Sequence, residues 1–375
     1  MARRGDARSD PTATARGEER QLASRDDRLI AVLKKISPGT GLREGVDRIM
    51  KAGKGALVVL GLSGEVRSVL SGGFKMETGF TAQRLGEVAK MDGAIILDDD
   101  VERIVWANVH LVPDPKVRTS ETGTRHRTAE RVARQTGKPV IAVSESMRLV
   151  TLYVDGSKHV LEPISSILFR ANQALATLER YRTRLNEVST SLSYLEVENV
   201  VTLRDALNVL QRAEMVRRIA DEIDMYVAEL GNDGRLLQLQ LDELMRGVDS
   251  ERTLVVRDYR SELLPVHDVL AEIDAVDAED LLSLSTLAKV LGREPDDEGI
   301  DRHVTPRGYR MLSRIPRLPD SVMEKLVHRF SSLEALMAAS VESLDEVEGV
   351  GASRARSIKE GLSRLAESSI LERYA

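Results

Sequence analysis

The chain has 375 residues and a formal net charge of −6, a length that accommodates two or three domains. It contains no cysteine, which excludes disulfides, thiolate metal sites and cysteine nucleophiles and is typical of a cytosolic protein. It also lacks a run of about 18 apolar residues, so we expect no transmembrane helix.

Residues 1–27 form a polar segment rich in Arg, Asp and Glu. The segment lacks the apolar stretch of a secretory signal. Because its composition offers little apolar surface to bury, we expect a disordered tail.

Residues 28–162 have the pattern of an α/β domain. Two helical stretches between residues 28 and 53 flank the break "SPGTG", and further helices are expected at 81–91 and 126–136. The β-rich runs between them predict a mixed, largely buried sheet flanked by helices. The expected strands are 55–60, 66–70, 93–98, 103–111, 140–144, 149–154 and 158–162.

Residues 163–300 predict an all-α spine. After Pro163 the sequence is glycine-poor, and apolar residues recur at three- and four-residue steps, which indicates one long helix followed by several more. Residues 221–300 carry 21 Asp and Glu against 7 Lys and Arg, a charge balance that repels DNA. Residues 293–308 are expected to be a linker or hinge.

Residues 301–375 predict a small all-α domain. The segment "LDEVEGVGASRARSIKEGLSRL" (344–365) is typical of a helix, a tight turn permitted by glycines, and a second helix. The backbone N–H groups of such a turn can hold a DNA phosphate without reading base sequence. The predicted DNA-binding residues are Gly349, Val350, Gly351, Arg354, Arg356 and Lys359.

A similar outline at 312–330 makes this end of the chain resemble the tandem helix-hairpin-helix domains of repair and recombination proteins. Residues 301–375 carry 12 Lys and Arg against 11 Asp and Glu, so they repel DNA less than the spine does. Aromatic residues make up 3% of the chain and offer no stacking platform for single strands, which favours duplex or branched DNA. The alternative is a structural or protein-docking hairpin.

The segment "ETGTRHRTAERVARQTG" (121–137) places unusual charge at a helix start. The helix is expected to end at Gly137 and to begin near Thr124 as its N-cap. Positive side chains in the first turn oppose the helix dipole by roughly 0.3–1 kcal/mol each, which a bound polyphosphate would explain. Arginines that point into solvent are the other interpretation. The residues concerned are Thr124, Arg125, His126, Arg127 and Thr128.

A second candidate lies in "AKMDGAIILDDD", where Asp92, Gly93 and Ala94 stand between a helix and an apolar strand. A carboxylate at such a junction can hold Mg²⁺ or Mn²⁺ beside phosphates, and glycine lets backbone approach a ligand. Asp-Gly is also a common turn. We interpret the acidic run 98–100 as a solvated turn rather than a metal cluster.

The two segments, with "NVHLVPDP" (108–115) between them, resemble the diadenylate cyclase family. The order of α/β domain, helical spine and helix-hairpin-helix end, over about residues 28–375, resembles the bacterial members of that family that scan DNA integrity. The resemblance implies that two ATP molecules are joined into cyclic di-AMP with release of two pyrophosphates, using Mg²⁺ or Mn²⁺. It also implies a symmetric octamer in the cytoplasm that associates with the nucleoid when bound to DNA.

The same resemblance implies residue roles. Asp92 would be the catalytic, metal-binding aspartate, and Gly93 and Ala94 would contact nucleotide. Leu111 and Ser144 would lie beside the base and ribose. The first-turn residues 124–128 would cradle phosphates, with proton donation as an alternative role for His126. His126 is not expected to bind metal, because no His or Cys partner lies at ligand spacing.

Two other functions remain open at this point: a non-catalytic DNA-binding or repair scaffold that senses nucleotides, and a structure-specific nuclease. The nuclease lacks a convincing cluster of metal-binding carboxylates. A coupling between the state of bound DNA and nucleotide synthesis is a further hypothesis.

Overall fold

The computed structural model describes residues 27–145, 147, 149–294 and 299–372. The predicted disordered tail therefore lies outside the described residues except for its last position, and so does part of the predicted linker. The chain divides into two compact units, Met1–Gln173 with Ile223–Leu239, and Ala174–Glu222 with Gln240–Ala375.

The first unit contains an eight-stranded sheet in the order β2-β5-β4-β1-β6-β7-β8, with β3 paired to β5. β1 and β4 are parallel and the other pairs are antiparallel, so the sheet is mixed, as predicted. The strands are β1 (Ala56–Leu60), β2 (Leu70–Ser71), β3 (Phe74–Gly79), β4 (Ala94–Leu97), β5 (Arg103–Leu111), β6 (Val140–Val143), β7 (Val150–Val154) and β8 (Ser157–Leu161).

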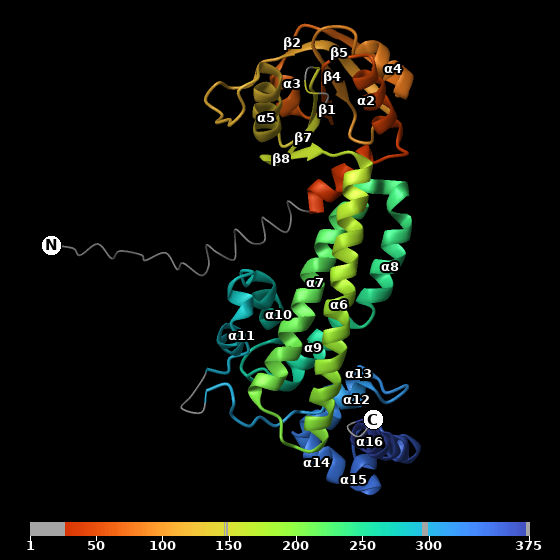
Figure 1. Cartoon of the computed structure of the whole chain (residues 1–375), viewed down its shortest axis with the longest axis vertical. Coiled ribbons are helices and arrows are strands. Elements are labelled where there is room, and N and C mark those ends of the chain that lie inside the picture. The colour runs from red at the N-terminus through yellow and green to blue at the C-terminus, as the bar shows by residue number, and fades with distance from the viewer. Residues whose placement is uncertain (1–26, 146, 148, 295–298, 373–375) are drawn as a thin grey trace, which may run out of the picture. The chain divides into compact units, whose positions relative to one another are not determined.

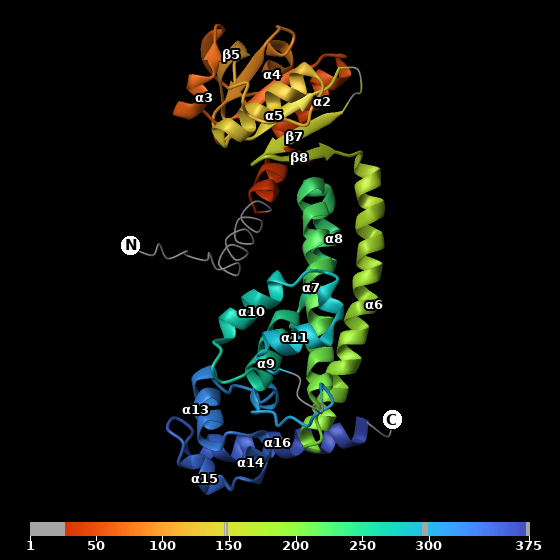
Figure 2. The same cartoon turned by 90° about the vertical axis from the view of Figure 1, so that its left-hand side faces the viewer.

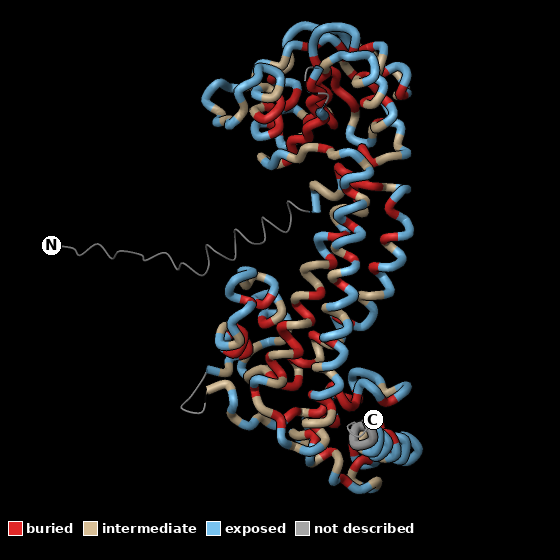
Figure 3. Tube along the Cα trace, in the orientation of Figure 1, coloured by how far each residue is buried: buried red, intermediate tan, exposed pale blue. Residues whose placement is uncertain are grey.

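Helices cover both faces of this sheet (Figure 1). A helix at 27–36, α2 (Gly41–Lys51) and α4 (Ala82–Val88) lie on one face, and α3 (Gly64–Ser68) and α5 (Thr124–Thr136) on the other. β1 is apolar at every position because its alternate side chains enter the two cores, one on each face of the sheet. The central strands are accordingly buried (Figure 3).

Three sequence expectations in this unit were wrong. Residues 66–70 were expected to be a strand but belong mostly to α3, because Ser63 caps a helix there by accepting from the N–H of Val66. β3 was not predicted, because it is a largely exposed edge strand of mixed polar sequence. Thr124 is the first residue of α5 rather than its N-cap, since the extended backbone of Gly123 fills that position without a side-chain bond.

The predicted helical region is confirmed. It comprises α6 (Ile164–Val197), α7 (Leu203–Leu230), α8 (Arg235–Met245), α9 (Val248–Tyr259), α10 (Val266–Ala275) and α11 (Leu284–Val290), with short 3₁₀ turns at Gly231–Gly234 and Asp280–Leu282. α6 and α7 lie side by side (Figures 1 and 2). Among the described residues, no helix combines the length and apolar character needed to cross a membrane.

The chain ends in a small helical domain with its own apolar core. Its helices are α12 (Tyr309–Ser313), α13 (Asp320–Phe330), α14 (Leu333–Ala338), α15 (Val341–Asp345) and α16 (Gly351–Glu372). The architecture of mixed sheet, helical spine and terminal helical hairpins is the predicted one.

A buried polar joint fixes this helical domain to the spine within the second unit. The carboxylate of Asp258, on α9, accepts the backbone N–H groups of Gly308, Tyr309 and Arg310 at 2.7, 2.8 and 2.9 Å and so caps α12. The Arg310 guanidinium is 1% exposed and pairs with Glu196 and Glu251 at 2.5 and 2.7 Å. The first turn of α12 is therefore held by charges from α6 and α9.

Candidate functional site

One edge of the sheet gathers the predicted nucleotide residues. β4 runs parallel to β1, and β6 runs antiparallel to β1, so the segment before β4 and the segment after β6 meet at the same edge. β5 is antiparallel to β4, and its carboxyl end reaches this edge too. The sheet thus brings together Asp92, Gly93, Ala94, Leu111 and Ser144, which come from three separate parts of the sequence.

The first turn of α5 reaches the same edge. α5 packs against β6 and β7 and runs antiparallel to β6, so its amino end lies where β6 ends. The guanidinium of Arg125 lies against Gly55, the residue before β1, where an added Cβ would overlap it. Sequence reasoning missed Gly55, and only its position directly before a buried strand could have drawn attention to it.

The Asp92–Gly93 turn is built by close packing against β5. Gly93 has a φ of +109°, and a Cβ there would lie 2.8 Å from the backbone carbonyl carbon of Asn108. Glycine is therefore required for this approach. Asp92 is exposed at the turn, so its carboxylate can face a ligand.

The described residues contain no group of three or more His, Asp or Glu side chains that could hold a metal ion by themselves. Mg²⁺ is commonly bound through one or two carboxylates together with substrate phosphates and waters. The exposed Asp92 carboxylate fits that arrangement, with the remaining oxygens supplied by nucleotide.

The acidic run 98–100 forms the expected turn. The Asp98 carboxylate accepts the backbone N–H groups of Glu102 and Arg103 at 2.8 and 3.1 Å. Asp99 pairs with Lys138 at 2.6 Å. These carboxylates belong to the turn that joins β4 to β5, at the end of β4 opposite to Asp92.

The three residues of the Arg-His-Arg triplet have different surroundings. Arg125 is exposed beside β1, whereas Arg127 donates to the carbonyl of Thr122 at 2.9 Å and so shapes the loop before α5. His126 is half-buried, and its Nδ1 lies 2.9 Å from the hydroxyl of Tyr153. Arg125 is therefore the triplet side chain most available to an anion.

A chain of hydrogen bonds continues from His126. Tyr153, 1% exposed on β7, donates its hydroxyl to Glu121 at 2.9 Å, and the same carboxylate oxygen accepts from Lys158 at 2.7 Å. The hydrogen bond from Lys158 holds the pKa of Glu121 below its ordinary value. Burial raises the pKa of Tyr153 far above its ordinary value, so the phenol stays protonated.

Buried Glu130, on α5, fastens the loop before that helix. Its carboxylate accepts the hydroxyl of Thr119 at 2.5 Å and the backbone N–H of Ser120 at 3.1 Å, and it pairs with Arg134 at 2.7 Å. Sequence reasoning missed Glu121, Glu130 and Tyr153. For Glu130, the available signal was a charged residue on the buried face of an amphipathic helix.

The remaining predicted nucleotide residues lie at or near the sheet edge. Ser144 is buried, and its hydroxyl accepts the N–H of Met147 at 3.3 Å. Ala94 is buried between sheet and helices, Leu111 and Thr128 are partly exposed, and Thr124 is exposed. Their contacts with nucleotide stay predictions.

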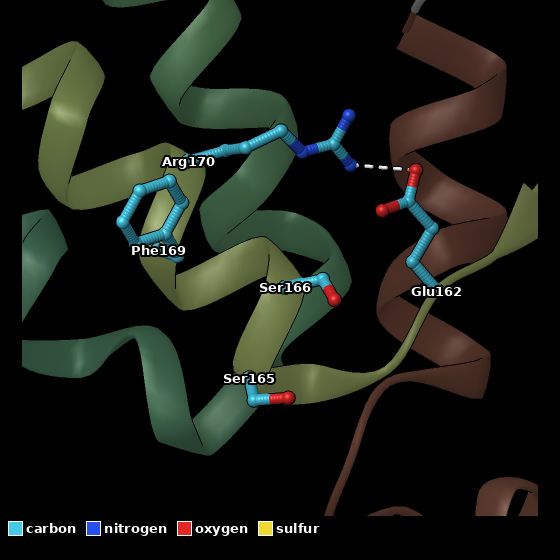
Figure 4. Close-up of a pocket in the computed structure, with 5 residues that line it drawn as sticks. All are labelled: Glu162, Ser165, Ser166, Phe169 and Arg170. Carbon is cyan, nitrogen blue, oxygen red and sulfur yellow. Dashed lines mark ion pairs between the residues drawn. The ribbon is translucent and has the colours of Figure 1, made fainter.

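The hollow in Figure 4 is a different place in the first unit. It lies at the start of α6 and is lined by Glu162, Ser165, Ser166, Phe169 and Arg170. Arg170 pairs with Glu162 at 2.7 Å. None of the predicted site residues lines it.

The predicted DNA hairpin lies between α15 and α16. Gly349 and Gly351 have φ values of +90° and +67°, so the turn uses the freedom of glycine. Arg354 donates to the carbonyl of Gly349, and Arg356 is exposed. Lys359 donates two of its three N–H groups to the carbonyls of Met337 and Ala339 at 2.7 and 2.8 Å, which leaves one for its predicted DNA contact.

The other hairpin, between α12 and α13, offers a poorer phosphate site. α13 begins with Asp320, whose carboxylate pairs with Arg257 at 2.6 Å. A negative side chain occupies the helix start to which a phosphate would bind. The glycine hairpin is thus the better candidate.

Comparisons with known proteins cover nearly the whole chain. Residues 43–158 match a model described as DisA bacterial checkpoint controller nucleotide-binding, residues 161–298 match the linker region of the same controller, and residues 315–370 match a helix-hairpin-helix motif.

Individual relatives agree with these matches. The DNA integrity scanning protein DisA of Acidothermus cellulolyticus is 59% identical over 358 residues, which span 93% of this chain and 96% of that protein. The DisA of Streptomyces coelicolor is 54% identical over 367 residues, 96% of this chain and 98% of that protein. A solved structure of DacA from Staphylococcus aureus is 23% identical over 36% of this chain and 86% of that one, with a TM-score of 0.28, a likeness too weak to add to the argument.

Proposed function

The chain belongs to the DisA family of DNA integrity scanning proteins, and on that premise we propose that it condenses two ATP molecules into cyclic di-AMP at the sheet edge described above. Its nucleotide-binding domain makes it a diadenylate cyclase, a nucleotidyltransferase. Family membership favours this over a non-catalytic scaffold or a nuclease. The observation that supports the location is the meeting of Asp92, Gly93 and the first turn of α5 at one edge.

Asp92 would hold Mg²⁺ or Mn²⁺ together with phosphate oxygens. When bound, such an ion polarises the phosphates and neutralises the charge that develops on them. The exposure of Asp92 leaves room for this arrangement.

The residues of the chain would mainly position the nucleotide. Arg125, the first backbone N–H groups of α5 and the hydroxyls of Thr124 and Thr128 would hold the triphosphate. Gly93 and Ala94 would contact the nucleotide, Arg127 and His126 would complete the phosphate grip, and Leu111 and Ser144 would lie beside base and ribose.

The reaction needs little covalent work from the protein. The 3′-oxygen of one ATP forms a bond to the α-phosphorus of the other, and pyrophosphate leaves with the electrons of the broken α–β bond. Asp92 helps to activate the 3′-hydroxyl, whose proton passes to solvent as the new bond forms. The same step with the roles of the two nucleotides exchanged closes the ring. Positioning and charge stabilisation supply most of the acceleration.

One sheet edge binds one ATP in this scheme, so two edges must face each other in a symmetric oligomer. We propose the octamer that the family resemblance implies, two tetramers that meet through their cyclase domains. A cytoplasmic location with nucleoid association on DNA belongs to the same proposal. The proposed domain bounds are 28–162, 163–300 and 301–375, after the tail 1–27.

The helix-hairpin-helix end would bind duplex or branched DNA through the hairpin Gly349–Val350–Gly351 and through Arg354, Arg356 and Lys359. We propose that the state of bound DNA changes the rate of synthesis. Synthesis rates measured with linear and with branched DNA test this coupling, and equal rates would exclude it.

The proposed reaction is tested by incubating the protein with ATP and Mg²⁺ or Mn²⁺ and separating the products by chromatography. Cyclic di-AMP and two equivalents of pyrophosphate are the expected products. Bound ATP that stays unreacted with either metal would contradict the proposal.

A further inference from the structure

The hydrogen bonds around His126 determine which ring nitrogen carries a proton. Tyr153 has a single hydroxyl hydrogen, and two acceptor candidates, Glu121 and His126, lie 2.9 Å from its oxygen. Glu121 also accepts from Lys158, and its lowered pKa keeps it ionised and unable to donate. The hydrogen of Tyr153 therefore goes to Glu121, and Nδ1 of His126 must donate to the Tyr153 oxygen.

The other ring nitrogen is a lone-pair acceptor. Nε2 of His126 is buried and has no hydrogen-bond partner among the described residues. A proton there would make a buried, unsatisfied cation, which is costly. Burial lowers the pKa of His126; the charge of Glu121 raises it, and those of Lys158 and Arg125 lower it. The neutral ring with Nδ1–H is therefore the favoured form.

This form cannot donate to a phosphate, although it stands in the first turn of α5 beside Arg125. An anion that reaches Nε2 shifts the equilibrium from the neutral ring toward the imidazolium, because it stabilises a proton on Nε2. Glu121, linked through Tyr153, stabilises the resulting imidazolium from the other side.

We propose that Glu121 and Tyr153 are positioning residues that fix His126 as its Nδ1–H tautomer. When a nucleoside triphosphate binds, Nε2 of His126 takes up one proton from solvent. The inference rests on the proposed function, because it takes the ligand to be ATP. Among the residues that the structure describes, the charged or titratable groups that act on the ring or its partner Tyr153 are Glu121, Lys158, Tyr153, Arg125 and, through Tyr153, Glu130.

The tautomer is measured by ¹⁵N solid-state NMR of the full chain labelled at histidine, with the His126 signals identified by their absence in His126→Gln. In the free protein we expect a protonated Nδ1 and an unprotonated Nε2. A protonated Nε2 in the free wild-type protein would overturn the inference, whatever any variant does.

Proton uptake is measured by calorimetric titration with 3′-deoxy-ATP in buffers of different ionisation enthalpy near neutral pH. This probe keeps the triphosphate and lacks the attacking hydroxyl. We expect the wild type to take up a proton, His126→Gln to lose this uptake, and Tyr153→Phe to show it only at lower pH. Uptake that is the same in all three proteins would overturn the inference.

Tyr259→Phe is the matched control, because Tyr259 is also buried and donates its hydroxyl to a carboxylate, that of Glu196, in the second unit. Its proton uptake should equal that of the wild type. The two proposals fail differently: absence of 3′-deoxy-ATP binding contradicts the proposed function, whereas binding without proton uptake contradicts only this inference.

Discussion

The guanidinium of Arg125 lies against the backbone of Gly55, at the point where the first turn of α5 meets the start of β1. A Cβ at residue 55 would overlap the guanidinium, so a side chain there requires Arg125 to move. It joins the helix that carries the Arg-His-Arg triplet to the sheet edge that carries Asp92.

Gly55→Ala should displace Arg125 and weaken nucleotide binding. We expect the affinity for ATP to fall by at least about tenfold, the scale of a lost charge-assisted hydrogen bond. Titration calorimetry measures it. The control is Gly64→Ala, because a Cβ at Gly64 meets nothing within 4 Å. Equal affinities in the two variants would show that Arg125 does not hold phosphate from this position.

Arg356→Ala should weaken DNA binding without sequence preference and make the affinity less sensitive to salt. Arg356 is exposed beside the glycine hairpin, so it can neutralise a phosphate and release a counterion. Fluorescence anisotropy over a range of salt concentrations measures both effects. Arg184→Ala is the control, since Arg184 is an exposed spine residue paired with Glu187. An unchanged salt slope would place the DNA contact elsewhere.

Arg310→Met should destabilise the second unit by about 3–5 kcal/mol, because it leaves Glu196 and Glu251 without their buried partner. Denaturant unfolding measures the loss. Arg314→Met should cost less, since Arg314 donates to the neutral hydroxyl of Ser193 at 2.8 Å and its charge is the smallest named influence on the pKa of Glu251. The same contacts mean that removal of residues 309–375 would expose the joint, so point variants of the hairpin are the cleaner test of DNA binding.

Asp258 should make the stability of the second unit depend on pH. Burial and the nearby charge of Glu196 raise the pKa of Asp258 to about 7, although three backbone N–H groups oppose this. The folded state therefore binds more protons than the unfolded state, whose aspartate has an ordinary pKa of 3.8.

The free energy of unfolding should accordingly decrease as pH rises toward 7, by at most about 1.4 kcal/mol per pH unit, and level off above it. Chemical unfolding between about pH 5 and 8 measures the slope of the free energy of unfolding against pH. This range extends about one to two units to either side of the pKa of Asp258. Asp258→Asn should flatten it. A stability that increases with pH over this range would contradict the assignment.

The sequence predicted most of this architecture because its patterns are local. The apolar run of β1 and the steps of α6 indicate a buried strand and a long helix, and both are present. The strand predicted at residues 66–70 was wrong because a Ser cap at the start of α3 outweighed the β-branched residues after it. β3 was missed because an exposed edge strand needs no apolar pattern.

The candidate site was predictable only in part. Asp92 and the first turn of α5 stand out by charge and position, but their meeting depends on strand order, which no local pattern encodes. Gly55, Glu121 and Tyr153 act through contacts between distant segments, so only the folded chain shows them.

The most direct test of the central claim compares the wild type with Asp92→Asn, using Asp100→Asn, an exposed aspartate of the β4–β5 turn, as control. Cyclic di-AMP formed from ATP with Mg²⁺ or Mn²⁺ is quantified by chromatography, and the oligomeric state by light scattering. We predict that Asp92→Asn abolishes synthesis and retains the wild-type assembly, while Asp100→Asn remains active. A fully active Asp92→Asn protein would contradict the assignment of the sheet edge as the site of cyclic di-AMP synthesis.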